Sequence, residues 1–264
     1  METGSLNGAG RSRPGKRPSV RHLAVFLCLT SFAALSLSRV AAGAALYLDW
    51  DECGPSGQQT HANSCDSNEG IQQLYCAFTL DQPLDQVLGV ELVVDVQHSD
   101  PTVPAWWQLG VGGCRYEELT ADGGAPAGPA CTDLWLGQAA GGIQGYNVGQ
   151  PFGSPSQARI KVVLSLLPNQ ARTLNAGTVY YAARLNLTNV KTTGTDACDG
   201  CGASACLVLN SIWIKRLPGA AGGDLFFETP APDGGNMALW QGTANCQTVP
   251  VRRRTWGAIK SLYR

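Results

Sequence analysis

The chain has 264 residues, only 15% of them charged, and contains 32 glycines and 15 prolines. This balance fits short strands joined by many turns better than helices. Residues 45–251 carry eight basic against 19 acidic groups. An acidic body argues against a nucleic-acid partner, because binding nucleic acid requires a basic surface.

The N-terminus has the pattern of an export signal. Several basic residues precede the apolar run of residues 23–37, and small residues at 42–44 offer a cleavage site after Ala44. The run is shorter than the roughly 20 residues of a transmembrane helix. We therefore expect residues 1–44 to be a signal peptide with a basic extension and the mature protein to be secreted or at the cell surface. An uncleaved anchor is the alternative.

Alternation of apolar and polar residues predicts strands along the rest of the chain. It is clear in residues 90–96, 160–166 and 178–187, and residues 207–214 form the nearly continuous apolar run of an interior strand. Shorter candidates lie at residues 73–80, 106–111, 134–136, 225–228 and 238–241. These strands are enough for two packed sheets, so residues 45–250 are expected to form an all-β, antiparallel two-sheet sandwich.

Trp106 and Trp107 follow Pro104 and are candidates for stacking on a sugar ring or anchoring a protein partner. Because adjacent residues of a strand face opposite sides, we expect one of the two to point outward. The alternative is that both tryptophans fill the core.

Leu174, Gly177, Thr178 and Tyr180 match an L-x-x-G-T-x-Y signature. This segment of about ten residues resembles fibronectin-type and related sandwiches, in which the tyrosine hydroxyl bonds a backbone group upstream and locks the corner between the sheets. The resemblance implies a sandwich of the fibronectin, immunoglobulin or cohesin kind, and carries no function. The alternative is a strand that merely begins after a glycine turn.

Nine cysteines follow the export signal, whereas Cys28 lies inside it and is expected to leave with it. Oxidising conditions outside the cell favour disulfides. The disulfide candidates are Cys53, Cys65, Cys76, Cys114, Cys131, Cys198, Cys201, Cys206 and Cys246. Cys114 and Cys131 bracket a Gly- and Pro-rich loop, which a bridge between them would close. Since nine is odd, at least one cysteine has no intramolecular partner, and connectivity does not follow from the sequence.

Two metal sites are alternatives to this disulfide reading. Cys198, Cys201 and Cys206 have a spacing that also suits three thiolate ligands of zinc. The fourth zinc ligand would be His61, His98 or Cys246. Asp49, Asp51 and Glu52 are rich enough in oxygen to be an alternative calcium site, but the expectation is that the protein has no cofactor.

No catalytic motif marks this chain as an enzyme. His61 and His98 are the two histidines after the signal, and neither lies in a motif. No nucleophile elbow, phosphate-binding loop or dinucleotide fingerprint is present. We therefore predict a secreted, non-enzymatic binding or structural protein with an extracellular protein or glycan as partner. A hydrolase of extracellular polymers is the alternative, and it would need two titratable groups that converge in a cleft.

The C-terminal residues 251–264 are basic, and a helix there would place Trp256, Ile259 and Leu262 on one face. This tail and the C-x2-C-x4-C element with its following apolar strand resemble a set of uncharacterised exported bacterial proteins that end in T-W-G-x-I-K-x-L-Y-R. The resemblance implies a shared style of secretion and a β-sandwich body. The tail either packs on its own domain or serves as a sorting or docking segment.

Overall fold

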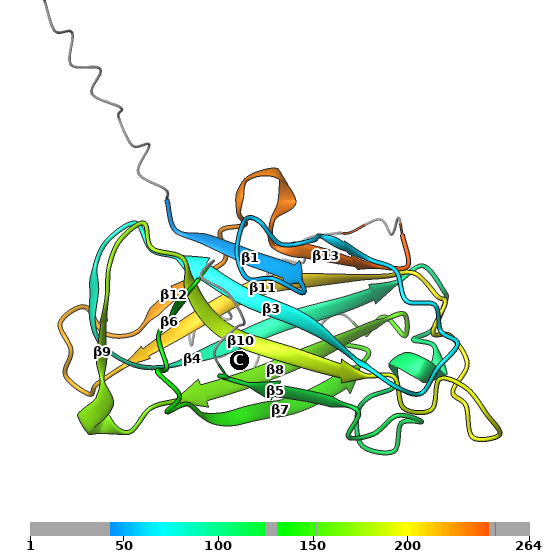
Figure 1. The fold of residues 1–264 in the computed structure, drawn as a ribbon. Coiled ribbons are helices and arrows are strands. Elements are labelled where there is room, and N and C mark those ends of the chain that lie inside the picture. Colours follow the sequence, from blue (N-terminus) through cyan, green and yellow to red (C-terminus); the bar gives the residue numbers. More distant parts are fainter. Residues whose placement is uncertain (1–42, 125–130, 151–152, 243–245, 247–264) are drawn as a thin grey trace, which may run out of the picture. The chain divides into compact units, whose positions relative to one another are not determined.

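The computed structural model describes residues 43–124, 131–150, 153–242 and 246, all within one compact unit, Arg39–Arg264. These residues form thirteen strands and three short 3-10 helices. The strands make two sheets, as expected for an all-β sandwich (Figure 1). Within the described part, no helix has the length and apolar character needed to cross a membrane. The apolar run of residues 23–37 and the expected C-terminal helix lie outside the described residues.

The first sheet has five strands, in the order β1-β3-β10-β5, with β6 beside β10. Their bounds are β1 (Ala45–Trp50), β3 (Ile71–Thr79), β5 (Leu119–Asp122), β6 (Thr132–Asp133) and β10 (Tyr180–Thr188). All pairs are antiparallel except β6 with β10. Strand β1 is therefore an edge strand of this sheet.

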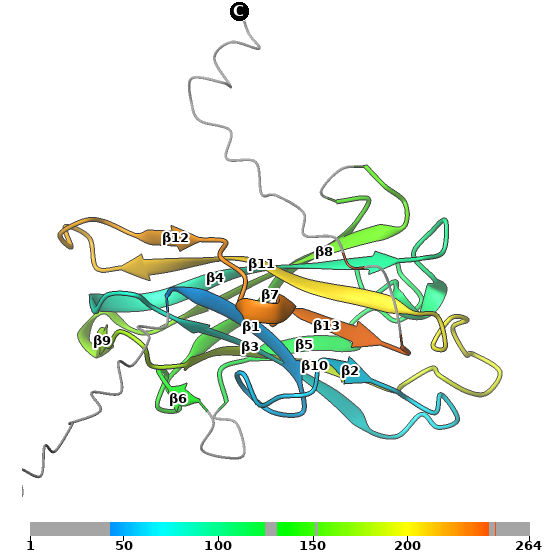
Figure 2. The ribbon, with the colours of Figure 1, turned by 90° about the horizontal axis from the view of Figure 1, so that it is seen from above.

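The second sheet has eight strands, in the order β2-β13-β11-β4-β8-β7, with β12 beside β11 and β9 beside β4. Their bounds are β2 (Thr60–His61), β4 (Leu84–His98), β7 (Ala140–Val148), β8 (Gln157–Ser165), β9 (Arg172–Leu174), β11 (Ala205–Arg216), β12 (Leu225–Phe227) and β13 (Met237–Trp240). The long strands β4 and β11 lie side by side along its centre (Figure 2).

The core lies between the sheets and is made by the apolar members of each alternating strand. In the second sheet Leu92 pairs with Val162 and Val94 with Ile160, and all four side chains are buried. Leu48 of β1 faces them from the first sheet as part of the same core cluster. Each such side chain contributes about 1.5–3 kcal/mol when it leaves water, so period-two alternation is enough to orient these strands.

Two of the expected strands are wrong. Residues 106–111 do not extend as a strand, because Pro104 precedes a 3-10 helix, η1 (Ala105–Trp107), and glycine-containing turns follow it. Residues 134–136 form a turn in which Leu136 has φ 49°. A short apolar run bounded by proline or glycine therefore does not identify a strand here.

Tyr180 forms the expected tyrosine corner. Its hydroxyl accepts a hydrogen bond from the backbone N–H of Asn175 at 2.6 Å, and its side chain is buried. Gly177 has φ +69°, the left-handed conformation that glycine adopts without strain. The chain can therefore turn sharply between β9 and β10, and the phenol holds the turn in place.

Eight of the nine cysteines after residue 44 form disulfides, as expected for most of them. The pairs are Cys53–Cys131, Cys65–Cys201, Cys114–Cys198 and Cys206–Cys246. Cys76 on β3 is free and fully buried. The expected bridge between Cys114 and Cys131 is wrong, because each of them pairs with a cysteine on a distant segment rather than closing its own loop.

Candidate binding site

A pocket of about 540 Å³ lies beside the edge strand β1. It is lined by Tyr47, Asp49, Pro55, Gly57, Gln59, Pro232 and Gly235. Its volume is within the usual range for small-molecule sites, about 300–1,000 Å³. The described lining residues supply one carboxyl group, one phenol and one amide beside small residues, and no basic side chain is among them.

The alternation of β1 places Asp49 on the outer face of the first sheet. Leu46, Leu48 and Trp50 point into the core, so Tyr47 and Asp49 between them point the other way. The strand that positions the pocket is thus held by three buried apolar side chains.

Two segments that are far from each other in the sequence form the walls of the pocket. Both pair with the edge of β1 that does not face β3. On one side Trp50 and Gln58 exchange backbone hydrogen bonds of 2.7 and 3.3 Å. On the other, the Leu48 N–H donates to the carbonyl of Gly235 at 2.8 Å, and the Leu46 N–H donates to that of Thr229 at 3.0 Å. Figure 2 shows the chain between β12 and β13 passing beside β1. The pocket is therefore built on ordered backbone.

Gly57 sits directly against Asp49. A Cβ atom at Gly57 would lie 2.2 Å from the Asp49 Cβ and 2.7 Å from the Glu52 carbonyl oxygen. Only glycine allows this loop to approach β1 so closely. The loop removes Asp49 from water as a result.

Asp49 is 3% exposed, although it forms part of the pocket wall. Within the described structure its Oδ2 atom is buried and has no hydrogen-bond partner. Burial disfavours the charged form and raises the pKa of Asp49 to about 7. The carboxyl group is thus close to evenly divided between its neutral and ionised forms at neutral pH.

A second, more open hollow of about 370 Å³ lies between the loop of residues 108–113 and the end of β7. Val111 is 89% exposed there and Val148 50%. Among the described residues, its lining side chains carry no ionisable group other than the Tyr146 phenol, whose hydroxyl already donates to the carbonyl of Trp107. The amides of Asn147 and Gln150 line this hollow, but its described part has no buried, unpartnered carboxyl group comparable to Asp49.

The expectation that Trp106 or Trp107 points outward is wrong. Both are buried, at 0% and 1% exposure, because they lie in the 3-10 helix η1, where adjacent side chains do not alternate. Trp106 stacks on Trp240 with ring centroids 5.1 Å apart, and Trp107 meets the same ring edge-on at 5.5 Å. The Arg115 guanidinium lies over Trp106. These rings close one end of the core and cannot stack on a sugar ring.

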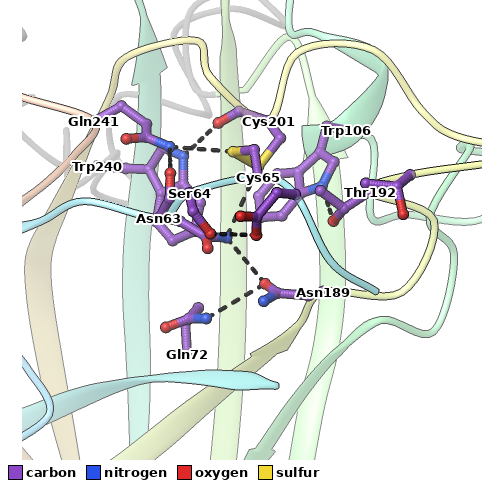
Figure 3. Close-up of a disulfide and its surroundings, with 12 residues drawn as sticks. Asn63, Ser64, Cys65, Gln72, Trp106, Asn189, Thr192, Cys201, Trp240 and Gln241 are labelled. Atoms are coloured by element: carbon purple, nitrogen blue, oxygen red, sulfur yellow. Dashed lines mark hydrogen bonds between the residues drawn. A yellow bond between two sulfur atoms is a disulfide. The ribbon is translucent and has the colours of Figure 1, made fainter. Parts of the chain in front are cut away.

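The three cysteines of the zinc alternative belong to three different disulfides, with Cys114, Cys65 and Cys246 as partners. Figure 3 shows Cys65–Cys201 surrounded by hydrogen bonds. The Gln241 amide donates to the carbonyl of Asn63 at 2.6 Å, and the Trp240 indole donates to that of Cys201 at 2.7 Å. The bridges of Cys198 and Cys201 join loops, whereas Cys206 lies on β11.

The residues of the calcium alternative do not converge. Asp49 is buried, whereas Asp51 and Glu52 are exposed. Asp51 has φ 62° and lies 3.6 Å from Nδ1 of His61. Among the described residues, no group of three or more His, Cys, Asp or Glu side chains is arranged to hold a metal ion.

The two histidines lie in aromatic surroundings. The His61 ring is 5.1 Å from Trp50 and 5.4 Å from Trp240, and the His98 ring meets Trp107 edge-on at 5.3 Å. Burial lowers the pKa of His98 to about 4, so it is neutral at physiological pH. The tail residues Trp256, Ile259 and Leu262 lie outside the described residues.

The alternation of residues 45–50 was available in the sequence and could have indicated that Asp49 faces away from the core. Its burial could not have been anticipated, because Gly57 and Gly235 come from other segments. Sequence reasoning considered Asp49 as a calcium ligand and missed Tyr47 and Gln59 altogether.

No family model matches the chain, and no curated protein matches its sequence. One similar solved structure is the second type II cohesin module from the cellulosomal adaptor ScaA scaffoldin of Acetivibrio cellulolyticus, 11% identical, covering 70% of this chain and 85% of that one, with a TM-score of 0.29. Another is a type II cohesin domain from the cellulosome of Acetivibrio cellulolyticus, 13% identical, covering 75% and 95%, with a TM-score of 0.27. At these scores the likeness carries no inference about function. The resemblance to exported proteins with a C-x2-C-x4-C element stays a prediction.

Proposed function

We propose that this chain is an exported, non-enzymatic binding module that recognises an extracellular protein or glycan through the pocket beside β1. The observation that carries the proposal is the buried, unpartnered carboxyl group of Asp49 in the wall of that pocket. A concave site with a few placed polar groups is the usual form of a recognition site. Tyr47 adds an aromatic surface and Gln59 an amide that can both donate and accept hydrogen bonds.

Export is supported by the cysteine chemistry. Four disulfides in one domain are typical of an extracellular protein, because the cytosol keeps thiols reduced. The basic and apolar N-terminal segment supplies the signal in this proposal, and the mature protein begins at Ala45. Ala45 is the first residue of β1, so cleavage there leaves the sheet complete.

The pocket is also rigid enough to be specific. Its walls are hydrogen-bonded to β1, and the Cys53–Cys131 disulfide ties down the chain directly after that strand. A site held by strands and covalent cross-links does not have to be ordered when the ligand binds, so less affinity is lost.

The proposal is tested with the oxidised, exported protein in a binding screen against extracellular glycans and proteins. Tyr47→Ala removes the aromatic wall, and Tyr116→Ala is the matched control because Tyr116 is exposed at 48% and is not among the residues that line the pocket. We expect the control to bind like the wild type and Tyr47→Ala to bind about tenfold or more weakly at an unchanged melting temperature. Equal binding by all three proteins would place recognition elsewhere on the surface.

A hydrolase is the second candidate function, and the pKa of Asp49 favours it. A carboxyl group with a pKa of about 7 suits a general acid at neutral pH. Hydrolysis would appear as soluble fragments released from a polymer by the wild type and not by Asp49→Asn. Binding without fragment release supports the non-enzymatic proposal.

A further inference from the structure

We propose that the pocket beside β1 binds a primary ammonium group, with Asp49 as its counter-ion. This inference rests on the proposed function and names the ligand chemistry of the same site. The ammonium group can come from two sources outside the cell: a lysine side chain of a protein partner or an amino sugar of a deacetylated glycan.

The Asp49 carboxyl group is buried without the partner that a buried carboxylate needs. A buried carboxylate is costly unless a cation or hydrogen-bond donors face it. Among the described residues, Oδ2 of Asp49 has no donor, and no lysine, arginine or histidine lines the pocket. By contrast, the buried carboxylate of Asp95 accepts two hydrogen bonds from Arg159, at 2.6 and 2.7 Å. The protein supplies a cation in one case; in the other, a ligand would supply it through the small part of Asp49 that is open to the pocket, since Oδ2 itself is covered.

The narrow access to the Asp49 carboxyl group favours an ammonium group over a guanidinium group. With Asp49 only 3% exposed, little of its carboxyl group is open to the pocket. A guanidinium group binds carboxylates best through two parallel hydrogen bonds, which need both oxygens in reach, whereas an ammonium group needs a single point of contact. The Tyr47 ring beside it can add a cation–π contact.

The charge of the surrounding protein supports the same inference. Residues 45–251 carry eight basic and 19 acidic groups, so the body attracts cations over a distance before the pocket selects one. The charge complementarity favours an ammonium ligand over an uncharged sugar or an anion.

Binding of the ammonium group requires the ionised form of Asp49, and the pH therefore sets the affinity. The titratable groups packed around it are Tyr47 on its own strand and Tyr75 and the Cys76 thiol on β3, whereas the loop that follows packs against it with Gly57. The charge of Asp49 contributes, after burial, to the raised pKa of Cys76. The raised pKa of Asp49 itself is caused by its burial. For a lysine-type amine, which stays protonated up to about pH 10, affinity should rise by about tenfold per pH unit below pH 6 and level off above about pH 8.

The experiment is a calorimetric titration of the oxidised, exported protein with two pairs of probes. Nα-acetyl-lysine amide is compared with its Nε-acetylated form, and a glucosamine oligomer with the matching N-acetylglucosamine oligomer. Within each pair the skeleton is the same, and acetylation replaces the ammonium group by a larger, uncharged amide. We expect the amine of at least one pair to bind about tenfold or more tightly than its acetylated form. The pair that binds identifies the source of the ammonium group.

Two variants test whether binding depends on the charge of Asp49 in the pocket or on acidic charge elsewhere nearby. Asp49→Asn keeps the shape of the side chain and removes its charge, and it should abolish both the amine preference and the pH dependence. Asp51→Asn is the matched control, because Asp51 is an exposed acid two residues further along and does not line the pocket. It should keep the amine preference. Melting curves show whether each variant is folded.

The outcomes distinguish this inference from the proposed function. If amine and acetylated probes bind equally, or if Asp49→Asn still prefers the amine, the ammonium inference is wrong. In that case, if uncharged probes bind the wild type and Tyr47→Ala abolishes their binding, the proposed function still holds. Binding that is insensitive to both Tyr47→Ala and Asp49→Asn would overturn both.

Discussion

Asp49 and His98 show how burial shifts the two kinds of ionisable group in opposite directions. Burial raises the pKa of Asp49 to about 7 and lowers that of His98 to about 4, and in both cases it favours the neutral form. The folded state therefore binds the Asp49 proton more tightly than the unfolded state, and the His98 proton less tightly. Asp49 makes folding less favourable as pH rises from about 4 to about 7, and His98 makes it less favourable as pH falls from about 6.5 to about 4.

We expect Asp49→Asn to change the pH dependence of stability. In the wild type, ionisation of Asp49 lowers the free energy of unfolding by up to about 4 kcal/mol between pH 4 and pH 8, from its shift of about three pKa units. Asparagine does not ionise, so the variant should lack this decline. Urea denaturation at several pH values measures the difference. Asp51→Asn should retain the wild-type slope, and a wild-type slope in Asp49→Asn would mean that the carboxyl group is solvated.

The turn between β9 and β10 depends on a single phenol. Tyr180→Phe removes the acceptor for the Asn175 N–H while leaving the ring in the core. We expect the free energy of unfolding to fall by about 1–2 kcal/mol, because the partly buried hydrogen bond from the Asn175 N–H loses its acceptor. Chemical denaturation provides the measurement, and Tyr116→Phe on the exposed Tyr116 is the control. A loss no larger than that of the control would show that water replaces the phenol.

The strands that the sequence predicts best are those in which every second residue enters the core. β4, β8 and β10 contain such alternating segments, which were predicted, although β4 extends beyond the predicted residues 90–96 to Leu84–His98. β11 was predicted from its nearly continuous apolar run instead, and most of its residues are buried. β7 could not be predicted, because its sequence AGGIQGYNV contains three glycines and little alternation, and its extended form depends on pairing with β8. Local pattern therefore finds strands that carry the core, and long-range pairing creates the others.

The candidate site was harder to predict than the fold, for a related reason. β1 was not predicted, although the alternation of residues 45–50 could have placed Asp49 on its outward face, and the surroundings of Asp49 come from residues 55–59 and 232–235. The tryptophans showed the opposite error. Trp106 and Trp107 looked suited to binding because they are large and adjacent, whereas Pro104 starts a 3-10 helix that turns both toward Trp240. Whether an aromatic residue is exposed depends on the neighbouring segments.

The pairing of the cysteines across the domain leads to a sharp chemical expectation. Cys76 is free but fully buried, and the other eight cysteines after residue 44 are oxidised. The native protein should therefore take up no iodoacetamide. Unfolding without reductant should add one label, at Cys76, and reduction should add eight more to the mature chain. Intact-mass spectrometry counts the labels, and labelling of the native protein at several cysteines would contradict the disulfide pattern.

Two of these bridges limit how far the chain can be stretched. From Cys53 the shortest covalent path follows the chain to Cys65, crosses the Cys65–Cys201 bridge, continues to Cys206 and crosses the Cys206–Cys246 bridge. That path contains roughly 17 residues of backbone, about 60 Å when stretched, compared with more than about 600 Å for the uncrosslinked chain between the same ends. A pulling force applied at the two termini would thus meet a short covalent tether long before the sandwich could unravel, and a single backbone cut inside a bridged loop would not release the fragments.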